Sequence, residues 1–295
     1  PLTGFFVQTS IPRQVNLVNP AGLSLTYWDG PSNHGNGVIN GGTDIWSAWA
    51  PPLGNDNWTD AAGIPAAPWT DRGFAIFLGD PGTVTVDNTQ GQIRTRGMQF
   101  AVGGYVIDGQ PLTLVADLTN RGAATIRVGD GTPAGSAMTA TIDAVLVGNG
   151  TLMKTHLGTL VLTADNTYTG GTAIAGGVVS ISSDTNLGQA GTALSLDSGT
   201  LHTTADITSG RATTLGSEDG IFETDSLTTL TLTGVVGGPG ALIKTGDGSL
   251  VLTNDNTYAG GTAIGDDTLQ LGNGGTTGSI FGDVLNNGTL VFDRS

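Results

Sequence analysis

An internal repeat with an offset of 90 residues constrains this chain more than any other feature. Residues 150–181 align without a gap to residues 240–271, and 18 of the 32 positions are identical. The shared frame is G-x-L-x-K-T-x-x-G-x-L-V-L-T-x-D-N-T-Y-x-G-G-T-A-I. Its apolar residues alternate with polar ones, as in strands with one buried face, and its Gly and Asn-Thr steps favour turns. Units this short bury a core only by stacking on their neighbours, so the repeat predicts a solenoid.

The offset between the copies predicts the dimensions of the solenoid. Ninety residues are too many for one coil and suit about four coils of roughly 22 residues each. The 295 residues would then form about 12–13 coils. Since parallel strands stack about 4.8 Å apart, we expect a rod of roughly 60 Å.

The composition favours strands over helices. The chain has 49 Gly, 25 acidic residues and 10 basic residues, but its only Glu are Glu218 and Glu223 and its only Lys are Lys154 and Lys244. Exposed helix faces are usually rich in Glu, Lys, Arg and Ala, whereas strands accept Thr and β-branched residues. Hydrophobic residues make up 38% of the chain, which argues against disorder. We therefore predict an all-β fold.

Charge and cysteine content argue against several classes of protein. The formal net charge is −15, whereas binding to nucleic acid or to anionic lipid depends on Lys and Arg. The chain has no Cys, which excludes disulfides and thiolate zinc sites. No run approaches the roughly 18–20 apolar residues of a membrane helix. No signal segment begins at Pro1, so we expect that any such segment has been removed or lies outside this sequence.

The first quarter of the chain differs in amino-acid composition from the rest. All five Trp lie before residue 70, and nine of the 12 Pro lie before residue 82, in loop-like sequence around aromatic residues. We expect residues 1–75 to form an N-terminal cap with the first irregular coils, and residues 76–295 to form regular coils. A cap would cover the open sheet edge at that end. No similar segment follows Val291, so we expect the native rod to continue beyond Ser295.

The repeat resembles a known family. The stretches "GTLVLTADNTYTGGTAI" and "GSLVLTNDNTYAGGTAI" are similar to the passenger-associated repeat of bacterial type V autotransporters, G-x-L-x-K-x-G-x-G-x-L-x-L-T-x-x-N-x-Y-x-G-x-T. The first copy departs from this pattern at His156 and Leu157, where the second has Gly246 and Asp247. The resemblance implies a right-handed parallel β-helix. It also implies a passenger displayed on, or released from, a Gram-negative outer membrane, and a C-terminal outer-membrane barrel in the full-length chain.

Two short motifs are similar to hydrolase signatures but are better explained as turns. Asp197-Ser198-Gly199 matches the loop of aspartic proteases, which need two carboxylates sharing a proton, yet no second D-[ST]-G occurs. Gly246–Leu250, "GDGSL", resembles the G-D-S-L of a lipase class, but Gly248 interrupts the motif. The first copy has neither Asp nor Ser at this place. We expect both motifs to form turns.

The three histidines give little support for nucleophilic catalysis. A Ser-His-Asp triad needs one of His34, His156 or His202 to be held by a carboxylate. His34 lies in loop sequence, His156 in a turn, and His202 in a Thr-rich strand that faces solvent or a partner. No G-x-S-x-G elbow is present. We expect no catalytic residue and no enzymatic activity.

Candidate ligand sites are incomplete. Gly41–Trp46 and Val128–Thr132 are fragments of the calcium-binding β-roll nonapeptide, and "GGPGALIKTGDG" lacks the spacing of a phosphate-binding loop. We therefore expect no metal ion and no cofactor. An aromatic set near the N-terminus could bind sugars but more often forms the core of a cap: Tyr27, Trp28, Trp46, Trp49, Trp58 and Trp69.

These observations favour a structural and interaction protein. Our leading hypothesis is a passenger on the surface of a Gram-negative cell, or secreted from it, that acts as an adhesin. It would contact a host or matrix surface, or copies of itself, along a long β-face and its turns, and would bind no nucleic acid. Two alternatives are a released passenger that acts as a soluble effector on host cell receptors and a hydrolase carried on the β-helix.

Overall fold

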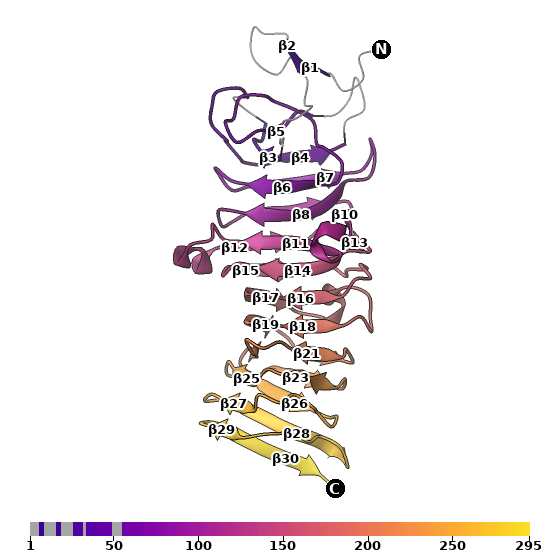
Figure 1. Cartoon of the computed structure of the whole chain (residues 1–295), viewed down its shortest axis with the longest axis vertical. Helices are drawn as coiled ribbons and strands as arrows, with labels where there is room; N and C mark the ends of the chain where they lie inside the picture. The colour runs from indigo at the N-terminus through magenta and orange to yellow at the C-terminus, as the bar shows by residue number, and fades with distance from the viewer. Residues whose placement is uncertain (1–5, 9–15, 19–25, 32–33, 49–54) are drawn as a thin grey trace.

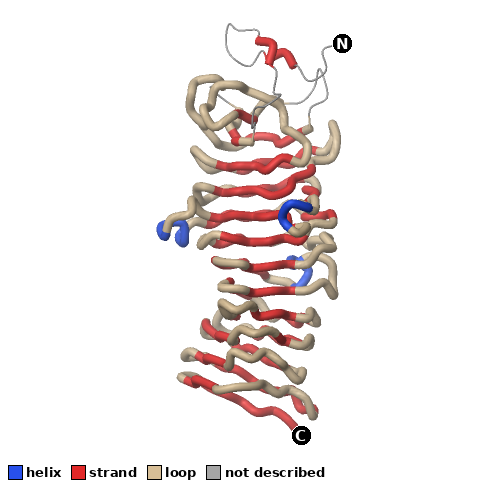
Figure 2. Tube along the Cα trace, viewed as in Figure 1, coloured by secondary structure: helices blue, strands red, loops and turns tan. Residues whose placement is uncertain are grey.

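The alternating apolar residues of the chain form short strands that stack in layers along one axis (Figure 1). In β14 (Thr151–Thr155) and β15 (Thr159–Leu162), every second residue is buried, as the sequence pattern predicts. The structure is a computed structural model that describes residues 6–8, 16–18, 26–31, 34–48 and 55–295. Loops join successive strands along the stack, and the widest of them lie near its N-terminal end (Figure 2).

Three parallel sheets form the faces of the rod. The first face contains β3 (Tyr27–Trp28), β5 (Trp58–Thr59), β6 (Gly73–Phe77), β8 (Arg94–Phe100), β10 (Leu112–Leu114), β11 (Ala123–Val128), β13 (Leu146–Gly148), β14, β16 (Thr172–Ile174), β18 (Leu194–Leu196), β21 (Thr213–Leu215) and β24 (Val236–Gly237). Only β5 is antiparallel to its neighbour on this face.

The second face is the longest uninterrupted ladder. It contains β4 (Asp44–Ser47), β7 (Thr83–Asp87), β9 (Val106–Gly109), β12 (Thr139–Ile142), β15, β17 (Gly177–Ile181), β19 (Gly199–Thr203), β22 (Gly220–Thr224), β25 (Leu242–Thr245), β27 (Thr262–Ile264) and β29 (Val284–Asn286). The third face contains β20 (Ile207–Ser209), β23 (Thr229–Leu232), β26 (Ser249–Leu252), β28 (Thr268–Gly275) and β30 (Thr289–Arg294). A separate antiparallel pair joins β1 (Phe6–Gln8) to β2 (Asn16–Val18).

Helical structure is minor in the part of the chain that the structure describes. It consists of the 3-10 helices η1 (Leu118–Asn120), η2 (Pro133–Ala137) and η3 (Asp184–Leu187). No helix among the described residues has the length and hydrophobicity needed to cross a membrane. The prediction of an all-β, parallel solenoid is therefore confirmed.

The rod has fewer coils than the sequence predicts. The eleven strands of the second face correspond to about ten turns, rather than 12–13. Ten steps of about 4.8 Å give a rod of roughly 48 Å, rather than 60 Å. Among the residues that the structure describes before Gly73, only the short strands β3 and β4 join the parallel stack, which accounts for the difference.

The two repeat copies lie on different faces of the rod. The first copy begins with β14 on the first face, whereas the second begins with β25 on the second face. Along the first face, β14 is followed by β16, β18, β21 and β24, at intervals of 19 to 23 residues. The 90-residue offset is therefore four coils and one additional face, rather than four whole coils.

The N-terminal tryptophans form a buried aromatic core. Trp28, Trp46 and Trp58 are completely buried and Trp69 is nearly so. Trp58 lies 5.2 Å from Trp28, 5.1 Å from Trp46 and 4.5 Å from Trp69, measured between ring centroids, and Phe77 continues the cluster into the rod. Aromatic pairs at such distances add to the stability gained by burial. These four residues thus form a core and not an exposed sugar platform, while Trp49 lies outside the described residues.

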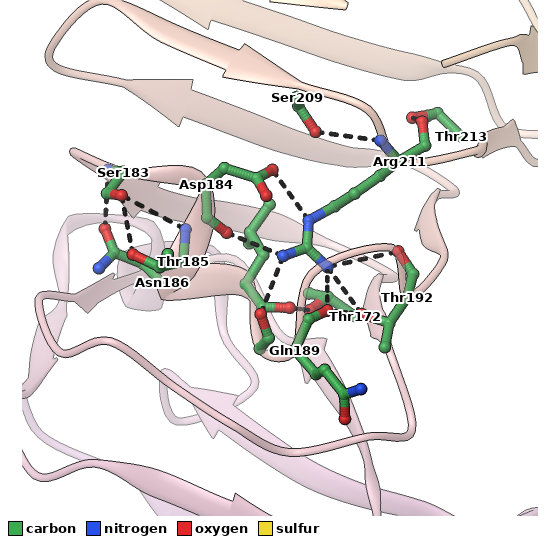
Figure 3. A network of polar contacts seen from close by, with 12 residues as sticks. Thr172, Ser183, Asp184, Thr185, Asn186, Gln189, Thr192, Ser209, Arg211 and Thr213 are labelled. Atoms are coloured by element: carbon green, nitrogen blue, oxygen red, sulfur yellow. Dashed lines mark hydrogen bonds and ion pairs between the residues drawn. The ribbon is translucent and has the colours of Figure 1, made fainter. Parts of the chain in front are cut away.

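A buried arginine joins two consecutive coils. Arg211 precedes β21, and its guanidinium points into the loop that joins β17 to β18 in the preceding coil (Figure 3). Its Nε donates to the Asp184 carboxylate at 2.9 Å, and its Nη2 donates to the carbonyls of Asp184 and Gly188, both at 2.9 Å. Its Nη1 donates to the Thr192 hydroxyl at 2.6 Å and to the carbonyls of Gln189 and Thr192. The loop therefore depends on a residue from the next coil.

The two repeat lysines are buried but differ in their partners. Lys154 Nζ donates to the carbonyls of Thr155, His156 and Gly176 at 3.1, 2.9 and 3.2 Å. Lys244 Nζ also donates to two local carbonyls, but its third partner is the Asp267 carboxylate at 3.0 Å. Burial lowers the pKa of Lys154 to about 7. Burial also lowers the pKa of Lys244, and the Asp267 carboxylate opposes this effect.

The first copy has no carboxylate beside Lys154, because Gly177 occupies the corresponding position. It aligns with Asp267, but its φ is 65°, and a Cβ at this position would lie 2.4 Å from the His156 carbonyl oxygen and 2.7 Å from Lys154 Nζ. Glycine tolerates this conformation because it has no side chain. Lys154 is thus a buried cation held by carbonyl groups alone.

We expect Lys154 to make the stability of the rod depend on pH. An unfolded lysine has a pKa near 10.4, so between about pH 7 and 10 the folded state binds fewer protons than the unfolded state. The cost of burying the charge is complete below pH 7 and disappears as the pH rises. The free energy of unfolding should therefore increase by about 1–3 kcal/mol from pH 7 to 9.5. Urea titrations of the native chain and of Lys154→Met measure this rise, most of which the variant should lose.

Lys244→Met is the matched control, because Asp267 reduces the shift at that position. It should retain most of the rise between pH 7 and 9.5. Burial raises the pKa of Tyr258 to about 12, so this phenol stays protonated in the folded state throughout the window. If the free energy of unfolding depends on pH equally in the native chain and in Lys154→Met, the rise does not come from Lys154.

Candidate functional site

The Asp197-Ser198-Gly199 motif is a turn between β18 and β19. Ser198 has a φ of 61°, and its backbone N–H donates to the carbonyls of Glu218 and Asp219 at 3.1 and 2.9 Å. The Asp197 carboxylate accepts a hydrogen bond from the Glu218 N–H at 2.9 Å. These contacts join the turn to the next coil and confirm the prediction of a turn.

The Gly246–Leu250 motif is a corner of the coil. Gly246 has a φ of 80°, and its carbonyl accepts a hydrogen bond from Lys244 Nζ at 3.0 Å. Ser249 begins β26 and pairs with Thr229 and Thr268 in the neighbouring coils. The residues that are similar to a lipase motif thus turn the chain and continue the sheet.

Two of the three histidines bind backbone groups. His34 is buried, its Nε2 contacts the Gly30 carbonyl, and its Nδ1 lies 3.7 Å from the Asp56 carboxylate. His156 has a φ of 65°, and its Nδ1 contacts the Gly129 carbonyl at 3.2 Å. His156 therefore lies in a turn, as predicted.

The third histidine belongs to a polar row that sequence reasoning missed. His202 Nδ1 lies 3.1 Å from Ser180 Oγ, and its Nε2 lies 2.8 Å from an oxygen of the Asp225 carboxylate. Glu223 is the register partner of His202 in the next layer. The residues come from three consecutive coils, so their sequence separations of 22 and 23 each correspond to one coil. Only this coil-length spacing could have indicated the row in advance.

The row has the composition of a catalytic triad but lies on the flat outer surface of the second face. Ser180 is 7% exposed and projects from β17, which is paired with β15 on one side and β19 on the other. The backbone N–H groups of a strand paired on both edges belong to the ladders, whereas acyl transfer needs free donors to stabilise an oxyanion. The row therefore has a base and its carboxylate partner but no oxyanion hole within β17.

The second face also carries a continuous uncharged strip. Six outward-facing, partly exposed residues lie in register on consecutive strands, and we call them the second-face ladder: Thr159, Val178, Thr200, Ile221, Ile243 and Ala263. The inward neighbours of these residues fill the core, so the ladder is not needed for packing. On a chain with a net charge of −15, such a strip is suited to contact with another surface.

The acidic turns do not converge. Among the described residues, no group of three or more His, Cys, Asp or Glu side chains is arranged to hold a metal ion. The Asp130 carboxylate, in the fragment Val128–Thr132, instead accepts hydrogen bonds from the N–H and the hydroxyl of Thr132 at 2.9 and 2.8 Å, which lower its pKa. Asp44, in the fragment Gly41–Trp46, accepts a hydrogen bond from the Asn57 amide at 2.7 Å.

Comparisons with known proteins agree with this architecture. The model of the passenger-associated-transport-repeat family matches residues 152–181 and 242–271. The chain is similar to the Adhesin BmaC autotransporter of Brucella suis biovar 1 (strain 1330), with 49% identity over 276 residues. That alignment covers 92% of this chain, which spans 8% of the length of the curated relative. No solved structure matches the chain. The two comparisons therefore support an autotransporter passenger domain that carries the passenger-associated-transport repeat.

Proposed function

We propose that this chain is a segment of an adhesin displayed on the surface of a Gram-negative cell, or secreted from it, and that it has no enzymatic role. The observation that carries the proposal is the 49% identity, over 92% of the chain, to an autotransporter that is named an adhesin. A C-terminal outer-membrane barrel in the full-length protein would anchor or export the rod. A host or matrix surface, or a second copy of the chain, would be the partner.

The second-face ladder is the contact surface in this proposal. Ile221 and Ile243 are the fourth and fifth of its six residues and lie side by side, between Thr200 and Ala263. A flat row of β-branched and hydroxyl side chains can make apolar contacts and hydrogen bonds over several coils. Binding energy usually depends on a few residues within a larger contact area, and the two isoleucines, as the largest apolar side chains of the ladder, should matter most.

A hydrolase is the second candidate, because Ser180, His202 and Asp225 form a hydrogen-bonded row. Their position on a flat, paired strand favours a structural role. In the proposed adhesin, the row joins three coils through side-chain hydrogen bonds. A released passenger acting on host cell receptors would use the same outer surface, and the distribution between cells and culture medium distinguishes it from a cell-bound adhesin.

Binding assays on the purified chain test the proposal. The chain should bind cultured host cells or immobilised matrix proteins, and Ile221→Lys combined with Ile243→Lys should weaken binding by about tenfold or more. Thr214→Lys, on the first face, is the matched control and should bind normally. Undiminished binding by the double variant, with a native strand spectrum, would reject the ladder. Ester or peptide hydrolysis that disappears in Ser180→Ala would favour the hydrolase.

A further inference from the structure

The exposed positive charge of the described chain is concentrated at one level of the rod. Three cationic side chains are buried, namely Lys154, Arg211 and Lys244. The exposed or partly exposed ones are Arg72, Arg94, Arg96, Arg121, Arg127 and Arg294. Five of these six lie between residues 72 and 127. Residues 71–127 contain five Arg and five Asp, so the entire formal charge of −15 comes from the rest of the sequence.

Strand pairing brings these arginines together. Arg94 and Arg96 lie on β8, which pairs with β6, β10 and β11. The Arg72 N–H donates to the Arg94 carbonyl at 3.0 Å, and Arg96 Nε donates to the Arg72 carbonyl at 2.7 Å. Arg72 and Arg96 line a groove of about 390 Å³ together with Val115, Asp117 and Leu118. We call this the arginine groove.

The carboxylates that line the groove already have hydrogen-bond partners within the protein. Arg94 donates to both oxygens of the Asp71 carboxylate, at 2.9 and 2.5 Å. The Asp117 carboxylate accepts hydrogen bonds from the N–H and the hydroxyl of Thr119 at 2.9 and 2.6 Å, and these bonds lower its pKa. The Arg72 side chain is 58% exposed and lies 3.8 Å from Asp71, which Arg94 already neutralises.

Two further arginines add charge beside the groove. Arg121 directly follows η1, whose residues Leu118 and Thr119 line the groove, and its guanidinium has no hydrogen-bond partner in the described part of the chain. Arg127 lies over the ring of Phe74, with its guanidinium carbon 5.0 Å from the ring centroid. The groove thus has more cationic than anionic groups available to a ligand.

We propose that the arginine groove binds an acidic glycan chain of a host surface, carrying sulfate or carboxylate groups. Guanidinium groups bind such anions through paired hydrogen bonds. Leu118, which is 90% exposed, and Val115 offer apolar contacts to the C–H face of a sugar ring. A duplex nucleic acid or a membrane would meet the acidic coils beyond the groove, whereas a single glycan chain is narrow enough to avoid them. The inference rests on the proposed adhesin function and names a partner class for it.

Binding to immobilised heparin, a sulfated glycan, tests the groove. The native chain should bind at 50 mM salt and weaken as salt increases, because salt screens the charges. Arg72→Gln combined with Arg96→Gln should weaken binding at least tenfold, whereas Arg294→Gln, an exposed arginine on β30, should leave it unchanged. Absence of heparin binding by the native chain, or equal loss in Arg294→Gln, would overturn the proposal. Binding to vesicles of phosphatidylserine that needs the same two arginines, without heparin binding, would assign the groove to lipid and reject the glycan.

Cell adhesion measured on the same variants separates this inference from the proposed function. If Arg72→Gln with Arg96→Gln adheres normally to cells while the ladder variant does not, the groove is not an adhesive site and the adhesin proposal stands. A second outcome is that heparin binding depends on Arg72 and Arg96, but neither the native chain nor any variant adheres to cells or matrix. This outcome would support the groove and reject the adhesin proposal.

Discussion

Replacing Arg211 by Met should lower the free energy of unfolding by about 3–5 kcal/mol, the usual cost of removing one partner of a buried charged network. The Arg211 side chain is 1% exposed and the Asp184 side chain 21%. Met has a similar length and no donors, so the substitution leaves the Asp184 carboxylate without its cation. It also leaves the carbonyls of Gly188, Gln189 and Thr192 without the donors that Arg211 supplies.

The effect of Arg211→Met should begin in the loop that Arg211 holds. Amide hydrogen exchange of residues 184–192 should accelerate more than exchange in the distant strand β28. Arg211→Lys should recover only part of the loss, because an ammonium group cannot reproduce the five hydrogen-bond directions of a guanidinium. Arg294→Met is the control, because Arg294 is exposed and such changes usually alter stability by less than 0.5 kcal/mol. A loss below about 1 kcal/mol for Arg211→Met would contradict the network's structural role.

Arg211 also illustrates what the sequence cannot predict. Its neighbours, "SGRATT", contain no signal that the side chain is buried. Its partners lie 19 to 27 residues earlier, in a loop whose conformation depends on Arg211 itself. The sequence could not predict the polar row for the same reason, because Ser180, His202 and Asp225 each belong to a different coil. Such clusters follow from the length of each coil, and coil lengths here vary between 19 and 23 residues.

The strands themselves were predictable because their signal is local. Alternation such as that of Leu160, Val161 and Leu162 specifies which residues face the core, and the repeat specifies that the strands stack. The aromatic core of Trp28, Trp46 and Trp58 also followed from composition. The number of faces did not, because the third face is formed partly by loops and has only five strands. The sequence offset therefore predicted four coils, and the additional face could not be recognised.

Because the two copies lie on different faces, a deletion can test whether one copy is able to replace the other. Removing Gly158–Asp247 joins Leu157 to Gly248 and places the second copy directly after the start of the first. The strand pairs of the two copies have the same register at an offset of 90. Leu152 pairs with Thr172 as Leu242 pairs with Thr262, and Leu160 pairs with Val179 as Leu250 pairs with Leu269. The shortened chain can therefore form the equivalent pairings, Leu152 with Thr262 and Leu250 with Leu269, with its last coils rotated by one face.

Side-chain contacts of the repeat should survive the same deletion. Tyr168 binds the hydroxyl of Thr172 and Tyr258 that of Thr262, each at 2.7 Å. Asn166 accepts a hydrogen bond from the Leu146 N–H as Asn256 does from the Val236 N–H. In the hybrid, Asp267 replaces Gly177 together with the backbone of the second copy, where Asp267 has no positive φ, so Lys154 should gain a carboxylate partner. The pH dependence that Lys154 causes should then decrease.

The deletion variant should fold into a monomeric rod about 20 Å shorter, with a native-like strand spectrum and a lower melting temperature. Its stability is roughly a sum over coils and their interfaces, so losing four coils weakens the fold without destroying it. Small-angle scattering measures the length. The control deletion, Val161–Val251, removes one residue more and joins Leu160 to Leu252 within a strand. Because a slip of one residue turns the inward side chains outward, this control should be insoluble. Equal insolubility of both variants would show that the copies cannot replace one another, and the rod would not be the modular stack that the repeat predicts.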